Sequence, residues 1–401
     1  MNPLLHSRLP RLLFLALLLS ADFLHGQPVP VELNPSNVSL QNEVQAAIDR
    51  GVAWLKTQQK PEGYWSTPDL PAMTAMPLTV FYRNPRRDPA SKPDEIMQKG
   101  MDFLLKTQQP TGGFYQPGER RYYNYNTAIS VMALVAADNP QWKEQILKAR
   151  QFLAGQQNDY DKPGEADNLL DGSFGYGSAP GETPKPSGDV STTTFVLEAL
   201  RATHTLSMDS KEPATKNLNW EGAIAFLERC QNLSKINKQP WVSDDSSNIG
   251  GFIYAPTRSM AGEVTLPDGR KTFRSYGSMS YAGLLSYIYA DLKKDDPRVQ
   301  AVYEWLRRNY TLEENPGMGT EGQFYYYQML AKALSAYGVD EITLSDGTST
   351  RWREDLAKKL LNTQKTDGFW INDDKARWME QDPVLVTSYA LLALELIQSR
   401  L

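Results

Sequence analysis

The stretch KTQQPTGGFYQ, residues 106–116, has a near copy upstream, KTQQKPEGYWS at 56–66, and another downstream, NTQKTDGFWIN at 362–372. In each copy Gln is followed by Gly or Pro, residues at which a helix ends and the chain turns. An aromatic residue comes next and is expected to pack back on the helix end. Internal self-similarity of this kind is the signature of a repeat architecture.

The pattern of helix and turn recurs along the chain as six units. Each unit opens with a helix that has one apolar stripe, as at Met97, Met101 and Leu104, and a polar opposite face. The units are AIDRGVAWLKTQQKPEGYW (47–65), IMQKGMDFLLKTQQPTGGFY (96–115), ILKARQFLAGQQ (146–157) with DGSFGYG (171–177), AIAFLERCQN (223–232) with GGFIY (250–254), VQAVYEWLRRNY (299–310) and EDLAKKLLNTQKTDGFW (354–370). We expect the Gln, Gly and aromatic residues to lock each first helix to the second helix that follows it.

A second helix is predicted after each phrase, and it is apolar on most sides. It carries a marker residue, usually Thr, followed six and seven residues later by Ala-Leu or a similar pair. The markers are Thr74, Thr127, Thr193, Ser280, Tyr327 and Thr387. A helix without a polar face is buried, whereas the first helices keep a solvated face. Six such pairs predict an all-α fold, an α6/α6 toroid of two concentric rings of helices; an open superhelix of helix pairs is the alternative.

Two insertions interrupt the regular spacing, 158–188 and 232–275. Both are rich in Gly, Pro, Ser and Asp. Segments of this length and composition are surface loops, and we expect both at one rim of the toroid.

Residues 1–26 are predicted to be a signal peptide. Basic residues precede an apolar run from Leu12 to Leu19, which is too short to span a bilayer and is followed by small residues. Cleavage would leave an N-terminal extension, 27–44, and a single toroid domain, 45–401. No later segment approaches 18 uninterrupted apolar residues, so a periplasmic or secreted protein without a membrane span is expected.

Composition excludes several classes of site. The formal net charge is −5, with acids and bases interspersed, so nucleic acid is not an expected partner. Cys230 is the one cysteine, which rules out an internal disulfide. Two of the three histidines lie in the predicted signal peptide, so His204 alone is left for a metal site or a serine triad.

The repeated phrases resemble the QW-type repeats of the squalene cyclase and protein prenyltransferase superfamily, the terpenoid cyclase superfamily. The resemblance covers about residues 45–398 and implies a toroid that functions at the inner-helix rim and in the central cavity. Class II terpene cyclases protonate an alkene with the middle Asp of a DxDDTA motif. The matching segment begins at Asp189, but Ser191 stands in the place of the proton donor and Thr192 replaces the third Asp. A serine cannot protonate an alkene, so ordinary squalene or hopene-type cyclisation is not expected.

The resemblance also raises zinc chemistry, because protein prenyltransferases hold a zinc ion with Asp, Cys and His. A zinc site needs three or four such ligands. Cys230 and His204 lie near the ends of different predicted helices, and neither has a second such ligand nearby. No metal and no cofactor is therefore expected.

Aromatic residues are dense where the chain enters the second helices. In the repeat alignment Tyr123, Asp189, Tyr276 and Gln323 occupy one position, four before the marker, and equivalent positions are expected to point into one ring. Asp189 is the candidate catalytic acid, and its place also suits a helix N-cap. The candidate ligand-binding residues are Tyr123, Tyr125, Tyr276, Tyr281, Tyr326, Trp378, Glu380 and Asp382. Alternatively, tyrosines at repeat junctions fill the core between helices, and neighbouring acids on loops are solvated.

Two classes of function stay open. The first is an enzyme, with cyclase, isomerase or lyase-like activity on an isoprenoid or other extended apolar substrate. Asp189 would then be the acid and the tyrosines would stabilise positive charge. The second is a non-catalytic toroid that binds a lipid, a glycan or a protein through the same cavity or the rim loops.

Overall fold

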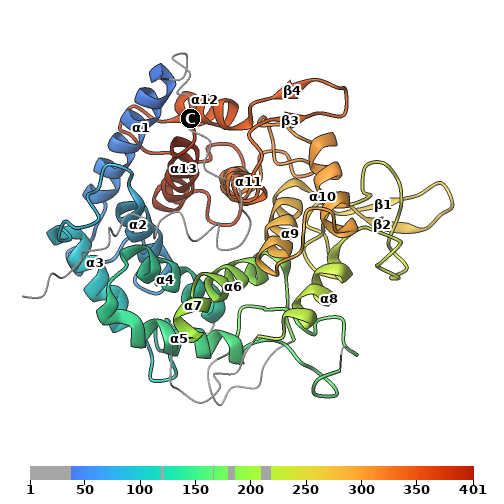
Figure 1. The fold of residues 1–401 in the computed structure, drawn as a ribbon, viewed down its shortest axis with the longest axis horizontal. Helices are drawn as coiled ribbons and strands as arrows, with labels where there is room; N and C mark the ends of the chain where they lie inside the picture. Colours follow the sequence, from blue (N-terminus) through green and yellow to red (C-terminus); the bar gives the residue numbers. More distant parts are fainter. Residues whose placement is uncertain (1–37, 119–121, 166, 179–185, 209–217) are drawn as a thin grey trace, which may run out of the picture.

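The computed structural model describes residues 38–118, 122–165, 167–178, 186–208 and 218–401, so the predicted signal peptide lies outside the described residues. Two sets of helices alternate along the chain. The outer set is α1 (Val38–Thr57), α3 (Glu95–Lys106), α5 (Lys143–Gly155), α8 (Trp220–Cys230), α10 (Pro297–Arg308) and α12 (Trp352–Thr363). The inner set is α2 (Ala72–Arg83), α4 (Tyr123–Ala137), α6 (Val190–Ala202), α9 (Gly277–Tyr289), α11 (Gln323–Tyr337) and α13 (Pro383–Gln398). Figure 1 shows the inner helices around the centre of the molecule and the outer helices around them.

The ring of inner helices is closed. Each inner helix packs against the next one along the chain, and α13 also packs against α2. The first outer helix, α1, contacts α12 and α13, which joins the two ends of the domain (Figure 1). The structure is the predicted all-α toroid of two concentric rings, and the open superhelix is wrong.

Burial follows the predicted difference between the two sets of helices. In α3 the buried residues are Met97, Gly100, Met101 and Leu104, a stripe at helical spacing. In α9 every residue from Gly277 to Tyr287 is buried. The outer helices thus have one apolar face, whereas the inner helices are surrounded by protein.

The glutamine of the repeated phrase binds backbone carbonyls. Gln108 Nε2 donates to the carbonyl of Gly112 at 3.0 Å and to the carbonyl of Gln145, in the first turn of α5, at 2.8 Å. The equivalent pair of bonds is made by Gln59, Gln157, Gln231 and Gln364. The acceptor lies in the next outer helix or, for Gln157, at the residue that caps it. The expectation that the glutamine locks the outer helix to the next inner helix is therefore wrong; we call this arrangement the outer-helix clasp.

The glycine of the phrase lets the loop approach the same outer helix. Gly112 has a φ of +95°, and a Cβ atom there would lie 2.2 Å from the carbonyl oxygen of Lys148 in α5. Gly172 repeats the arrangement, with φ +82° and 1.9 Å to the carbonyl oxygen of Gly222 in α8. Both the backbone conformation and the lack of space require glycine.

The aromatic residue of the phrase makes the link to the inner helix and explains the Thr marker. The backbone N–H of Phe114 donates to Thr127 Oγ1 in α4 at 2.9 Å. The same bond joins Trp65 to Thr74, Phe174 to Thr193, Phe252 to Ser280 and Trp370 to Thr387. This part of the predicted lock between outer and inner helices is confirmed.

The fifth unit departs from the pattern. Tyr327 stands for the marker Thr, and its hydroxyl donates to the carbonyl of Leu312 at 2.6 Å. Tyr310 stands at the position of the clasp glutamine, four residues after the buried Leu306, and its hydroxyl has no hydrogen-bond partner among the described residues. A tyrosine therefore reaches the preceding loop with its hydroxyl, whereas the other markers accept a bond from the backbone.

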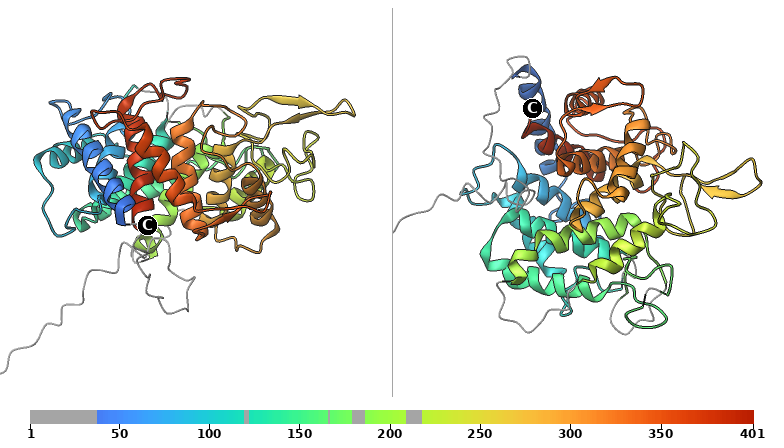
Figure 2. Two further views of the ribbon diagram at one scale, coloured as in Figure 1. Left: turned by 90° about the horizontal axis from the view of Figure 1, so that it is seen from above. Right: turned by 45° about the vertical axis from the view of Figure 1, so that its right-hand side comes forward.

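The insertions both connect an outer helix to an inner helix, so they lie at the rim where the inner helices begin. In the side view of Figure 2 (left) this rim is at the top, and the hairpin of β1 (Glu263–Thr265) and β2 (Lys271–Phe273) projects from it. The other short elements are η3 (Pro140–Trp142), α7 (His204–Met208), β3 (Ile342–Thr343) and β4 (Ser349–Thr350).

Helix α1 starts at Val38, within the segment 27–44 predicted from the sequence to be an N-terminal extension. Val44, which the prediction left in the extension, is fully buried. Of the helices in the described residues, none has the length and apolar character needed to cross a membrane.

Candidate functional site

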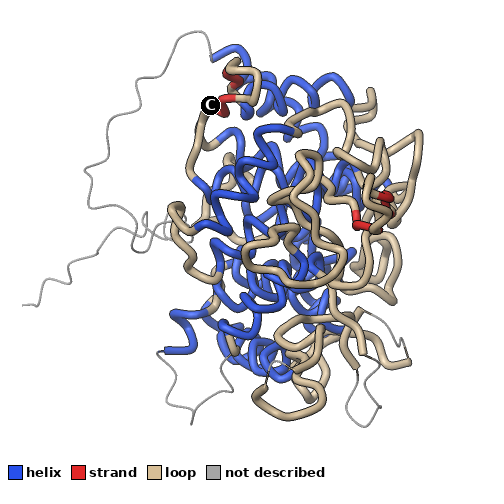
Figure 3. The backbone as a smooth tube through the Cα atoms, turned by 90° about the vertical axis from the view of Figure 1, so that its right-hand side faces the viewer, coloured by secondary structure: helices blue, strands red, loops and turns tan. Residues whose placement is uncertain are grey.

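The candidate site lies at the rim where the inner helices begin. The loops that lead from the outer to the inner helices meet there, including both insertions. Figure 3 views the molecule from the side of β1 and β2, where these loops cover the helices. Residues that are far apart in the chain are thereby brought to the mouth of the ring.

Asp189 is the N-cap of α6 and is almost fully buried. Its Oδ1 accepts the Thr192 N–H at 2.7 Å, and its Oδ2 accepts the Thr192 hydroxyl at 3.0 Å. Its exposed fraction is 4 %. Burial raises the pKa of Asp189 to about 6, although the bonds to Thr192 oppose the shift. The carboxyl group therefore both caps the helix and titrates in a range useful for proton transfer.

Two tyrosines connect Asp189 to the surface. The Tyr254 phenol lies close enough to Asp189 to lower the pKa of its carboxyl group, and the Tyr254 and Tyr176 hydroxyls are 3.3 Å apart. Tyr176 is 38 % exposed. These three polar groups form a relay that leads from solvent to the buried acid.

The sequence contained a signal for this relay that the prediction missed. Tyr176 and Tyr254 each stand two residues after the aromatic residue of the repeated phrase, which is Phe174 and Phe252 in these units. In the last unit the same position is Asn372, which also reaches a buried carboxylate at the rim. The position two residues after the aromatic residue of the repeated phrase thus indicates residues of the candidate site.

The residue in the place of the expected proton donor, Ser191, contacts a tyrosine across the ring. Its hydroxyl lies 2.9 Å from the Tyr325 hydroxyl of α11. Burial raises the pKa of the Tyr325 phenol above its usual value. The two hydroxyls can exchange a hydrogen bond, but neither is an acid strong enough to protonate an alkene.

The side chains at the equivalent positions Tyr123, Asp189, Tyr276 and Gln323 do not form the expected ring. The Tyr123 ring packs edge-on against Tyr115, with centroids 4.6 Å apart, and Gln323 binds the Glu313 carbonyl at 2.9 Å. Tyr276 is the buried N-cap of α9. These side chains at the helix starts make their contacts with the surrounding loops and helix ends.

A different set of aromatic residues surrounds the axis. Tyr125, Phe195, Tyr325 and Tyr389 come from α4, α6, α11 and α13, and we call them the axial tetrad. Successive ring centroids are 5.3, 6.1 and 6.0 Å apart, and the Tyr389 and Tyr125 hydroxyls are 3.5 Å apart. Of the predicted ligand-binding residues, Tyr125 belongs to this group.

The tetrad residues stand two or six residues after the position shared by Tyr123, Asp189, Tyr276 and Gln323 in the repeat alignment. Tyr125 and Tyr325 stand two residues after Tyr123 and Gln323, and Phe195 stands six after Asp189. Residues four apart share one face of a helix. The inward face was therefore predictable from helical geometry, and the prediction was two residues out of register.

Tyr281 and Tyr326 lie in the wall between α9 and α11. Their ring centroids are 5.6 Å apart, and the Tyr326 hydroxyl donates to the Thr311 carbonyl at 2.8 Å. Both are at most 1 % exposed. Their contacts are those of core residues between neighbouring helices.

Glu380 and Asp382 each cap an inner helix. Glu380 accepts the Tyr325 N–H of α11 at 2.9 Å and the Asn372 amide at 2.7 Å, and Asp382 accepts the Val384 N–H of α13 at 2.8 Å. Burial raises the pKa of Glu380 to about 7. Trp378, from the same loop, is 43 % exposed.

Beyond the tetrad the axis contains charged side chains that sequence reasoning missed. Lys332 of α11 pairs with Glu198 of α6, and both side chains are nearly buried. With Arg83, Gln328 and aliphatic residues they line a cavity of about 30 Å³. Both carboxyl oxygens of Glu395 are buried without a hydrogen-bond partner among the described residues. This cavity has space for one or two waters.

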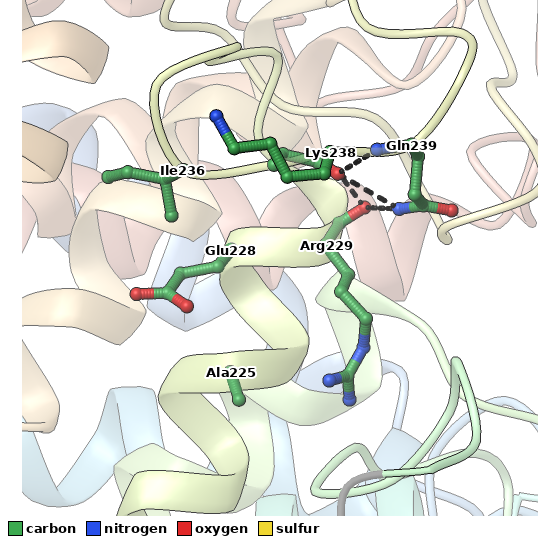
Figure 4. A pocket seen from close by; sticks show the side chains of 7 residues that line it. Ala225, Glu228, Arg229, Ile236, Lys238 and Gln239 are labelled. Carbon is green, nitrogen blue, oxygen red and sulfur yellow. Dashed lines mark hydrogen bonds between the residues drawn. The ribbon is translucent and has the colours of Figure 1, made fainter.

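A larger hollow of about 360 Å³ lies on the outside of the ring, between α8 and residues 236–239 (Figure 4). Its polar groups bind the protein itself. Gln239 Nε2 donates to the Arg229 carbonyl at 2.7 Å, and Glu228 accepts a bond from Arg298 at 2.6 Å. No acid, base or nucleophile is left to converge on a ligand there.

Within the described ranges, no group of three or more His, Cys, Asp or Glu side chains could hold a metal ion. Cys230 is buried in α8, and burial raises the pKa of its thiol.

Comparisons with known proteins bear on the fold. No protein-family model and no curated protein sequence matches this chain. Among solved structures, the chain is similar to the type II terpene cyclase MstE from Scytonema without ligand, with a TM-score of 0.53, 13 % identity and coverage of 90 % of this chain and 99 % of that one. A variant of that cyclase in complex with merosterolic acid A, its product, gives a TM-score of 0.52 and 12 % identity, with the same coverage. The chain therefore has a terpenoid cyclase-like fold.

Proposed function

We propose that the protein binds an extended apolar ligand of the isoprenoid class at the axial tetrad, outside the cytoplasm. The observation that carries the proposal is the tetrad itself, in which four inner helices each contribute an aromatic side chain to one place on the axis. Aromatic faces attract alkenes and positive charge. A structure with the same fold was determined with a product bound, which agrees with a ligand site in this fold.

Binding requires the tetrad to open, because the axial cavity of about 30 Å³ is far smaller than such a ligand. The other axial side chains include Met76 and Met132, which are flexible and adapt to the shape of a ligand. The tyrosines should therefore change environment when a ligand enters.

A proton-transfer reaction on this ligand is the second candidate, and the relay from Tyr176 through Tyr254 to Asp189 favours it. The relay can return a proton to Asp189 after it has donated one. With a pKa of about 6, Asp189 suits general acid or base catalysis near neutral pH better than alkene protonation.

The experiment uses the mature chain and detergent-dispersed isoprenoid alcohols. Binding is followed by intrinsic fluorescence and native mass spectrometry, and the lipid fraction is then examined for products. Tyr325→Leu should weaken binding several-fold, the scale of one lost aromatic contact. Tyr303→Leu removes a tyrosine that stacks on Tyr337, centroids 4.4 Å apart, away from the tetrad, and serves as the control.

The outcomes separate the two candidates. A product that disappears in Asp189→Asn identifies an enzyme, whereas ligand that is bound and recovered unchanged from both proteins identifies a binding protein. If no isoprenoid binds, or Tyr325→Leu binds as well as the wild type, the tetrad is core packing and the proposal is wrong.

A further inference from the structure

We propose a second binding site, on the rim, for a carbohydrate chain that carries carboxylate groups. Trp378 and Tyr176 would stack against its sugar rings, and Arg258 and Arg377 would pair with its carboxylates. This inference does not depend on the ligand proposed for the axis, since it rests on exposed residues of the rim loops.

The exposed aromatic residues are the first observation. Four large hydrophobic side chains are exposed in the described part of the chain: Val38, Leu169, Tyr176 and Trp378. The two aromatic ones both lie in loops that lead into inner helices. A flat aromatic face left open to water suits the C–H face of a sugar, while the edge and hydroxyl suit its polar groups.

The backbone at Trp378 is the second observation. Trp378 has a φ of +56° and Met379 a φ of +67°, both in the left-handed region. Bulky residues occupy this region at a cost of about 1–3 kcal/mol, so the surroundings must hold them there. Glu380, fixed by Asn372, follows directly, and the Trp378 ring lies over Gly322, where a Cβ atom would be 3.2 Å from the indole. The indole is thus held in place while it stays exposed.

The arginines are the third observation. The Arg377 guanidinium lies 4.4 Å from the Trp378 ring and uses Nη1 to bind Glu321 at 2.8 Å, which leaves its other N–H groups for a ligand. The Arg258 guanidinium lies 6.0 Å from the Tyr254 ring. It forms no salt bridge with any described residue. Arginine binds carboxylates with two parallel hydrogen bonds.

These groups belong to one surface. The loops are joined at the start of α9, where the Tyr276 N–H donates to the Phe252 carbonyl at 3.2 Å and the Gly277 N–H donates to the Pro316 carbonyl at 2.9 Å. Burial raises the pKa of the Tyr276 phenol and both guanidinium groups act to lower it, in agreement with this arrangement. Tyr254 connects Arg258 to Tyr176, whose hydroxyl is 3.3 Å from its own. The insertions supply Tyr176, Tyr254 and Arg258, and long loops on a rigid scaffold are where binding residues concentrate. Partly exposed rings together with guanidinium groups fit an acidic sugar chain better than a lipid tail.

The experiment measures binding by calorimetry with three probes: hexagalacturonate, cellohexaose and hexaglutamate. The first has sugar rings and carboxylates, the second has rings alone and the third has carboxylates alone. The variants are Trp378→Ala, Trp378→Tyr and the double variant Arg258→Gln/Arg377→Gln. Leu169→Ala and Arg86→Gln are matched controls, because Leu169 is equally exposed and the Arg86 side chain, 64 % exposed, pairs with Asp49 away from the rim loops.

We expect hexagalacturonate to bind more tightly than either other probe. Trp378→Ala and the double arginine variant should each raise its Kd roughly tenfold, the scale of one stacking contact or one charge-assisted pair. Trp378→Tyr should keep most of the affinity, and both controls should match the wild type. The inference is overturned if no probe binds, if cellohexaose or hexaglutamate binds as tightly as hexagalacturonate, or if Trp378→Ala has no effect. Each of these results leaves the isoprenoid experiment unaffected.

Discussion

Replacement of Gly112 by alanine tests the outer-helix clasp most directly. The new Cβ atom would lie 2.2 Å from the Lys148 carbonyl oxygen, inside the distance that real Cβ contacts show, and it meets backbone that cannot rotate away. The left-handed conformation, φ +95°, adds a cost of about 1 kcal/mol for any residue with a Cβ. Separation of the loop from α5 would also weaken the bond from Gln108 to the Gln145 carbonyl of α5, about 1 kcal/mol. We expect a total loss of about 3–5 kcal/mol.

Gly118 provides the control within the same loop. Its φ is +91°, but a Cβ atom there would meet nothing within 4 Å. Gly118→Ala should therefore cost only the backbone term, about 1 kcal/mol. The free energy of unfolding is measured by urea denaturation, followed by circular dichroism. Equal losses in the two variants would show that the contact with Lys148 does not hold the units together.

Three further predictions follow from the buried polar groups. Gln364→Ala removes one bond to the Ala47 carbonyl of α1 and one to the Gly368 carbonyl of its own loop, and should lower the unfolding free energy by about 2 kcal/mol in denaturant titrations. Gln58→Ala, beside a clasp glutamine but not part of the clasp, should change it little. Burial raises the pKa of Glu380 from 4.5 to about 7, so the folded state binds the proton of this carboxyl group more tightly than the unfolded state does. The free energy of unfolding should be greatest below pH 4.5 and fall by about 3 kcal/mol as the pH rises to 7, and unfolding curves across pH should show no such fall for Glu380→Gln. Lys332→Met leaves Glu198 buried without its cation and should lower the free energy of unfolding by about 3–5 kcal/mol, whereas Lys332→Met combined with Glu198→Leu should change it little. Additive losses in a double-mutant cycle would contradict the pairing.

The helix pairs and their closure were predictable because the periodic apolar residues and the Thr markers are local signals. The partner of the clasp glutamine was not, because its acceptors are backbone carbonyls, which every residue has. At Gln145 the side chain plays no part in the bond that Gln108 makes. The pairing of Lys332 with Glu198 is likewise a contact between residues 134 positions apart, which no local pattern indicates.

The predicted site residues and the side chains that reach the axis differ in register. Asp189 is at the rim, buried and close to aromatic side chains. Tyr123 and Gln323, aligned with it, point to the loops, because the first residue of an inner helix still lies over the turn before it. The side chains that reach the axis stand two and six residues later, as Tyr125 and Phe195 do.

The repeat contains positions whose residue type must stay constant and positions whose residue type can vary. A clasp glutamine or a marker threonine binds backbone, so its loss leaves a buried carbonyl or N–H without a partner. The tetrad side chains at positions two and six contact side chains of other inner helices, and the residue type at position two varies: it is Tyr125 in α4, Ser191 in α6 and Tyr325 in α11. KTQQPTGGFYQ therefore specifies the ring, and the residues a few positions into each inner helix specify what the ring can bind.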